Sequence, residues 1–121
     1  MINQGVVLVL DDDPTLGDLI VRALKMHDCE CFSAVNSSSA INRLESHPNI
    51  STLLVDYSLN EDIDGIEFIA MALKIRKDLR CILMSGNLNA LDGLMPHGVE
   101  MLSKPCRIDE LVRILVKGEA V

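Results

Sequence analysis

Short apolar runs alternate along this chain with segments whose apolar residues recur every three or four positions. The runs read as strands, and they lie at 6–10, 29–34, 52–56, 81–85 and 98–102. The segments between and after them predict helices, at 16–24, 37–44, 66–73, 87–95 and 108–115. Repeated strand–helix units with largely apolar strands predict an α/β fold, a parallel sheet covered by helices on both faces.

Composition limits the class of protein. The chain has 121 residues, 49% of them hydrophobic, which suits one globular domain spanning 1–121. A net charge of −7 argues against direct nucleic-acid binding, and no apolar run is long enough to span a membrane. The cysteines show no CxxC spacing and read as buried, reduced thiols of a cytoplasmic protein: Cys29, Cys31, Cys81 and Cys106.

Polar residues stand where the predicted strands end. Asp11 and Asp12 follow the first strand, Asp56 ends the third, Ser85 ends the fourth and Lys104 follows the fifth. Ligands of open α/β sheets bind at the carboxyl ends of the strands. The sequence therefore predicts one functional site at this edge of the sheet.

The residue types suggest what the site binds. Crowded carboxylates need a counter-charge, which a divalent cation or the ammonium of Lys104 could supply. Oxygen ligands favour magnesium, or manganese in its place, and the lack of nearby Cys or His ligands disfavours zinc. Asp13 stands directly before Pro14 and is predicted to cap a helix instead. A carboxylate, a metal, a hydroxyl and a lysine suit phosphoryl transfer to an aspartate.

Five sequence segments together resemble the receiver domain of bacterial response regulators, the CheY-like superfamily of two-component signalling. They are LVLDDDP, LLVDYSL, DGIEF, LMSG and LSKP, and the resemblance covers nearly the whole chain. It implies a flavodoxin-like (βα)5 fold, a doubly wound parallel five-stranded sheet in the order 2-1-3-4-5.

The resemblance also implies roles for individual residues. Asp56 matches the phosphoacceptor, Asp11 and Asp12 match the acidic pair that holds magnesium, and the backbone carbonyl of Ser58 matches a further metal ligand. Lys104 matches the family's lysine.

Other positions match the switch and its surroundings. Ser85 matches the hydroxyl residue that moves towards the phosphoryl group, and the bond from Lys104 to Pro105 is expected to be cis. Met101 occupies the position of the switch aromatic. Asn87, two residues after Ser85, lies with Ser58 where a water attacking the phosphoaspartate would approach.

The chain departs from the family pattern in its loops. Asn60 stands where proline is usual, and the pair Asp64-Gly65 comes one residue late. Cys106 replaces the aromatic residue usual after Lys-Pro. The fourth helix is poorly patterned.

The implied function is phosphoacceptor signalling, with no enzyme activity beyond the chain's own phosphorylation and dephosphorylation. The implied partners are a histidine kinase or histidine phosphotransfer protein, expected to dock around Pro14, Leu16 and the Pro105-Cys106 loop. A homodimer would use the face of the fourth helix, fifth strand and fifth helix. The chain is either a stand-alone receiver or part of a longer regulator or hybrid kinase.

Two alternatives remain open. The VLVLDDDPTL stretch also resembles the opening of haloacid-dehalogenase-like phosphatases, in which Asp11 would be the nucleophile and Asp13 the general acid/base. That reading leaves Asp56 without a role and leaves no room for a flap before the helix at Pro14. The other alternative is a pseudo-receiver that docks partners without being phosphorylated.

Overall fold

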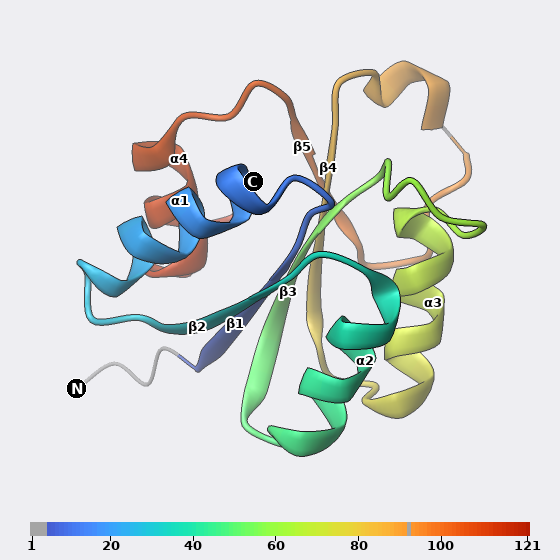
Figure 1. Cartoon of the computed structure of the whole chain (residues 1–121). Coiled ribbons are helices and arrows are strands. Elements are labelled where there is room, and N and C mark those ends of the chain that lie inside the picture. The colour runs from blue at the N-terminus through green and yellow to red at the C-terminus, as the bar shows by residue number, and fades with distance from the viewer. Residues whose placement is uncertain (1–4, 92) are drawn as a thin grey trace.

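The fold is a five-stranded, fully parallel sheet in the order β2-β1-β3-β4-β5 (Figure 1). The computed structural model describes residues 5–91 and 93–121. The strands are β1 (Val6–Leu10), β2 (Glu30–Ala34), β3 (Ile50–Asp56), β4 (Arg80–Ser85) and β5 (Glu100–Ser103). The helices are α1 (Pro14–Lys25), α2 (Ser37–Ser46), α3 (Gly65–Ile75) and α4 (Ile108–Leu115), with a 3-10 turn η1 (Leu88–Leu91). The predicted flavodoxin-like order 2-1-3-4-5 is confirmed.

The two faces of the sheet are covered by different helices. Figure 1 shows α1 and α4 on one face and α2 and α3 on the other. The side chains of β1 alternate between the two cores: Val7 and Val9 pack towards α1 and α4, and Val6, Leu8 and Leu10 pack towards α2 and α3. Both faces of this strand are buried, which explains its uninterrupted apolar sequence.

Side-chain caps set the starts of three helices. Asp13 caps α1 by accepting two backbone N–H groups of its first turn, and Pro14 is the first helical residue, as predicted. Asn36 caps α2. Asp64 and Glu67 form a reciprocal capping box at the start of α3. No helix in the described ranges is long and apolar enough to cross a lipid bilayer.

The connection between β4 and β5 differs from the sequence prediction. The helix predicted over 87–95 is only the turn Leu88–Leu91, because Gly93 adopts a left-handed φ of 81° and Pro96 follows. The strand predicted over 98–102 starts later, at Glu100, because Gly98 also has a left-handed φ. The other strand boundaries differ from the prediction by at most two residues.

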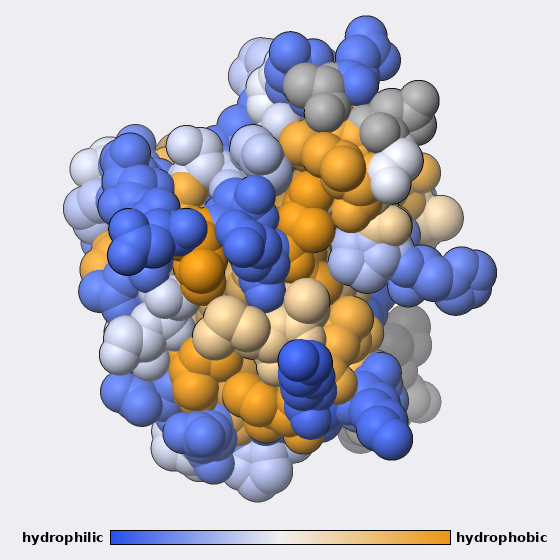
Figure 2. Space-filling view, turned by 90° about the vertical axis from the view of Figure 1, so that its right-hand side faces the viewer, coloured by the Kyte–Doolittle hydropathy of each residue, from blue (hydrophilic) through white to orange (hydrophobic). Residues whose placement is uncertain are grey.

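The face that carries α3 exposes apolar side chains. Figure 2 shows them gathered on this side of the molecule. Met71 and Ile75 of α3 are 42% and 43% exposed, and Leu94 after η1 is 60% exposed.

Candidate functional site

The predicted site residues meet at one edge of the sheet. Asp11 directly follows β1, Asp56 ends β3, Ser85 ends β4 and Lys104 directly follows β5. All strands run in the same direction, so these four positions lie at their common carboxyl edge. The winding of the sheet reverses between β1 and β3, where ligand sites of doubly wound folds form.

Three carboxylates converge there. One oxygen each from Asp11, Asp12 and Asp56 lies within 4.8 Å of the other two. Asp11 and Asp56 are buried and Asp12 is partly buried. Like charges this close, two of them shielded from water, need a positive partner.

Asp11 shows most clearly what kind of partner fits. Its Oδ1 accepts the backbone N–H of Asp13 at 2.9 Å, whereas its buried Oδ2 has no hydrogen-bond donor among the described residues. Burial raises the pKa of Asp11, and the neighbouring Asp56 and Asp12 raise it further. A hard divalent cation takes carboxylate oxygens as ligands, so this donor set fits magnesium or manganese.

Lys104 brings a positive charge to the carboxylate cluster. Its Nζ lies 3.0 Å from Oδ2 of Asp56 and 3.9 Å from Oδ2 of Asp11. The peptide bond between Lys104 and Pro105 is cis, as the resemblance implied. The backbone N–H of Lys104 donates to the carbonyl of Ser85 at 2.9 Å, which ties the lysine to the end of β4.

Three further predicted polar residues lie at the ends of β3 and β4, and one of them contacts Asp56. The backbone N–H of Ser58 donates to Oδ1 of Asp56 at 3.3 Å. Ser85 is buried, and its Oγ accepts the backbone N–H of Asn87 at 3.1 Å. The ligand role of the Ser58 carbonyl and the hydrolytic role of Asn87 stay predictions.

The predicted switch position lies farther along β5. Met101 is partly buried and pairs in register with Leu83 of β4. The side chain of methionine is flexible and can fill pockets of different shapes. Its switching role stays a prediction.

Asn60 is a site residue whose role the sequence did not reveal. Its Nδ2 donates to Oδ2 of Asp12 at 2.6 Å, and its backbone adopts a left-handed φ of 55°. The available signal was its place in the family pattern, where proline is usual. Proline has φ fixed near −65° and could not take this conformation.

Gly65 is a second residue whose role depends on close packing. A Cβ at this position would lie 2.5 Å from the carbonyl oxygen of Asp56 and 2.9 Å from Cα of Tyr57. The backbone N–H of Gly65 donates to the carbonyl of Tyr57 at 2.8 Å. The start of α3 is therefore packed directly against the end of β3, and only glycine fits there without a shift.

Asp13 has the capping role predicted for it. Its Oδ1 accepts the backbone N–H groups of Thr15 at 3.0 Å and Leu16 at 3.4 Å. This contact engages the carboxylate that the phosphatase alternative would use as general acid/base, and α1 follows it without an intervening flap.

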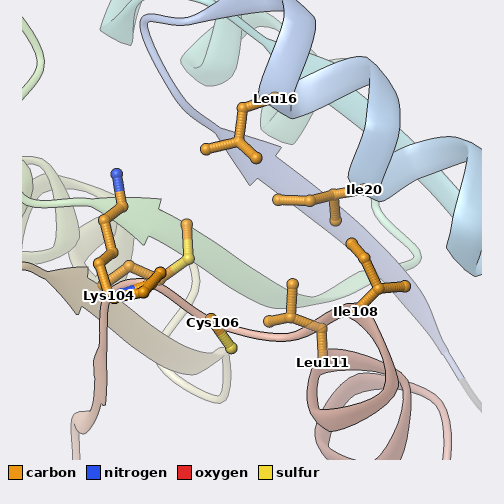
Figure 3. A pocket seen from close by; sticks show the side chains of 8 residues that line it. Leu16, Ile20, Lys104, Cys106, Ile108 and Leu111 are labelled. Carbon is orange, nitrogen blue, oxygen red and sulfur yellow. The ribbon is translucent and has the colours of Figure 1, made fainter.

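An apolar groove of about 350 Å³ lies beside the site, between α1 and α4. Figure 3 shows Leu16 and Ile20 of α1 facing Ile108 and Leu111 of α4. Met84 of β4, Lys104 and the two residues after it complete the lining, and the ammonium of Lys104 also pairs with Asp56. The sequence predicted docking around Pro14, Leu16 and the loop after Lys104, and the latter two border this groove.

Comparisons with known proteins agree with this architecture. The model of the family described as "Response regulator receiver domain" matches residues 7–116. The response regulator receiver protein CpdR of Brucella abortus is 32% identical over 115 residues, which cover 92% of this chain and 93% of that protein. A putative NtrX-like response regulator of Rickettsia conorii is 25% identical over 119 residues, covering 96% of this chain but 25% of the relative's length.

Solved structures show the same fold. A response regulator receiver domain protein from Clostridium thermocellum has a TM-score of 0.81 at 22% identity, covering 93% of this chain and 91% of the other. NtrX of Brucella abortus, solved in complex with ATP, has a TM-score of 0.82 at 22% identity, covering 93% of this chain and 26% of that one. At these identities the likeness shows the fold alone.

Proposed function

This chain belongs to the response regulator receiver domain family, and we propose that it is a phosphoacceptor that takes a phosphoryl group on Asp56. The observation that carries the proposal is the convergence of Asp11, Asp12 and Asp56 with Lys104 at the carboxyl edge of the sheet. Residues 1–121 form a single receiver domain in this proposal. It performs no turnover of an external substrate beyond its own phosphorylation and dephosphorylation.

The carboxylates and one carbonyl would hold the metal. Asp11, Asp12, Asp56 and the backbone carbonyl of Ser58 are the ligands for Mg²⁺, or Mn²⁺ in its place. The bound cation supplies positive charge that offsets the carboxylates and the transferring phosphoryl group. The donor-free Oδ2 of Asp11 supports this assignment.

The transfer itself uses an oxygen of Asp56 as nucleophile. That oxygen forms a bond to the phosphorus of a phosphohistidine while the P–N bond breaks, and the imidazole nitrogen leaves with the electron pair. Lys104, now 3.0 Å from Asp56 Oδ2, pairs with a phosphoryl oxygen after the transfer. Ser85 Oγ accepts the backbone N–H of Asn87, and its hydroxyl proton donates to a phosphoryl oxygen.

Phosphorylation then changes which surface the domain presents. The contacts of Ser85 and Met101 shift with the phosphoryl group, and this biases the face formed by η1, β5 and α4 between two states. A homodimer on that face is part of the proposal. Ser58 and Asn87 set the rate at which water removes the phosphoryl group.

The apolar groove between α1 and α4 is the proposed docking site of the phosphodonor. It opens beside Lys104, so a donor helix lying in it brings its phosphohistidine to the carboxylate cluster. Its lining of leucine and isoleucine side chains suits the apolar face of a helix. The donor is a histidine kinase or a histidine phosphotransfer protein.

Phosphorylation by acetyl phosphate tests the proposal without a protein donor. With Mg²⁺, the intact mass of the wild-type chain should increase by one phosphoryl group, and Asp56→Asn should abolish the increase. Asp62→Asn, which changes an exposed carboxylate of the same loop, is the matched control and should react normally. A chain that binds no Mg²⁺ and gives no adduct would indicate the pseudo-receiver. An adduct that survives Asp56→Asn but is lost in Asp11→Asn would favour the phosphatase.

A further inference from the structure

The loop after β3 holds the outermost carboxylate of the cluster. Nδ2 of Asn60 donates to Oδ2 of Asp12 at 2.6 Å. Among the three clustered acids, Asp12 is the one not fully buried, and it has two like charges beside it. Repulsion alone would turn its side chain towards solvent, so the amide opposes that movement.

The loop that carries Asn60 is itself anchored. Asn60 adopts φ 55°, a conformation that asparagine tolerates better than most residues. The next residue, Glu61, accepts hydrogen bonds from the backbone N–H and the hydroxyl of Ser37, the first residue of α2. The amide of Asn60 is therefore presented from a loop that is anchored to α2 at the next residue.

This hydrogen bond does not compete with a cation for Asp12. An ionised carboxylate has two oxygens with about four lone-pair positions, of which the amide uses one. Asp12 keeps ligand positions free while its direction is fixed. A ligand that is already directed at the site loses less conformational freedom when the cation binds.

We propose that Asn60 is a positioning residue for the divalent cation: its amide holds the Asp12 carboxylate facing Asp11 and Asp56 and so raises the affinity of the site for Mg²⁺. The proposal rests on the cation site of the proposed function. Proline, the residue usual here in the family, has neither the donor nor the φ that this contact requires.

Titration of the full chain with Mg²⁺ tests the role of Asn60. Tyr57 is the single tyrosine, the chain has no tryptophan, and Tyr57 directly follows Asp56, so its fluorescence reports on the site. The Mg²⁺-dependent rise in melting temperature is a second readout of affinity. Asn60→Gly removes the side chain with its amide donor and keeps the left-handed backbone conformation accessible. We expect its Kd for Mg²⁺ to be about fivefold higher than that of the wild type.

Two further variants separate this inference from the function on which it rests. Asn49→Gly changes another exposed asparagine, at the opposite end of β3, and should leave the affinity unchanged. Asp11→Asn should abolish Mg²⁺ binding. If Asn60→Gly binds Mg²⁺ as tightly as the wild type or more tightly, the positioning role is wrong while the cation site stands. If the wild type binds no Mg²⁺, or Asp11→Asn binds it normally, both proposals fail.

Discussion

At the scale of single residues, Asp11 combines near-complete burial with a carboxylate oxygen that has no hydrogen-bond donor among the described residues. Burial and two neighbouring carboxylates raise its pKa, so its ionised form is disfavoured in the folded state. Without a cation this charge lowers the stability of the domain at neutral pH. The same charge makes the site attractive to a divalent cation.

Asp11→Asn should therefore stabilise the metal-free protein. The amide oxygen can keep the hydrogen bond from Asp13 while the buried charge is removed. We expect the free energy of unfolding to rise by about 1 kcal/mol at neutral pH, which is a rise in melting temperature of about 4 °C. Melting in EDTA measures this difference, and the control Asp62→Asn should leave the melting temperature nearly unchanged.

The gain in stability of Asp11→Asn over the wild type should shrink as the pH falls through the raised pKa of Asp11, because protonation removes the same charge from the wild type. A variant less stable than the wild type at neutral pH would contradict this account.

The sequence revealed some of these residues better than others. The acids and Lys104 could be placed together because each directly follows or ends a predicted strand, and parallel strands share one carboxyl edge. The contact from Asn60 to Asp12 could not be predicted, because it joins residues 48 positions apart and depends on a loop conformation. The donor-free oxygen of Asp11 depends on side-chain burial, which periodicity does not give.

At the scale of elements, the junction of β3 and α3 places Asp56. Gly65→Ala should distort it, since the added Cβ would lie 2.5 Å from the Asp56 carbonyl oxygen. We expect a loss of at least about 2 kcal/mol in the free energy of unfolding. This is opposite to the usual benefit of alanine in a helix. Gly86→Ala, where a Cβ would meet nothing within 4 Å, is the control and should be neutral. Urea unfolding of both variants measures the effect, and equal stability of the two would refute close packing at this junction.

A second junction joins β4 and β5 to the end of the chain. Arg80 donates to the two carboxylate oxygens of Glu100 at 2.7 and 2.8 Å, and it also donates to the carbonyls of Ile114 and Glu119. The hydrogen bond from Arg80 holds the pKa of Glu100 below its ordinary value. A carboxyl with a lowered folded pKa stabilises the fold above its ordinary pKa and loses that contribution as the pH falls through the folded value.

Glu100→Gln should expose this pH dependence. We expect the variant to be less stable than the wild type by about 1 kcal/mol at neutral pH, a modest value because the pair is partly exposed. The difference should be constant above the ordinary glutamate pKa of about 4.3 and vanish in more acidic solution. Urea unfolding at several pH values measures it, with the exposed Glu45→Gln as control. A difference that persists unchanged in acid would mean that the carboxylate charge is not the cause.

Helices and strands were predicted best from sequence where a local signal was unambiguous. The apolar runs gave β1 with its observed bounds, and the Asp-Pro step gave the start of α1. The helix predicted over 87–95 was poorly patterned, and the structure has only the turn Leu88–Leu91 there. The left-handed backbone at Gly93 and Gly98 depends on how this segment packs. It prevents the helix from continuing through Gly93 and delays the start of the strand beyond Gly98.

At the scale of the whole molecule, the strand order places the groove, the lysine and the carboxylates in one continuous region. The alternation of strand and helix patterns was sufficient to predict the parallel sheet, and the family resemblance supplied its order. The sequence could predict only the approximate location of the groove between α1 and α4. Its shape depends on the packing of Ile20, Ile108 and Leu111.

If the phosphodonor protein docks in the groove, a substitution there should slow phosphoryl transfer from a histidine kinase but not from acetyl phosphate. Leu16→Lys should slow phosphoryl transfer from any histidine kinase that phosphorylates the wild type by about tenfold or more, since it places a charge in the apolar interface. The rate with acetyl phosphate should be unchanged, which also shows that the variant is folded. Leu19→Lys changes an exposed leucine of the same helix outside the groove and should not affect either donor. Equal slowing with both donors would argue against docking at this groove.

The identity of the phosphorylated residue is tested most directly by mapping the adduct on the chain. After reaction with acetyl phosphate and Mg²⁺, borohydride reduces an aspartyl phosphate to homoserine, which tandem mass spectrometry locates in a digest. The proposed assignment of Asp56, whose Oδ2 is the carboxylate oxygen paired with Lys104 at 3.0 Å, predicts homoserine at position 56 alone. Homoserine at position 11 or 12, with Asp56 unchanged, would contradict the assignment of Asp56 as the phosphoacceptor.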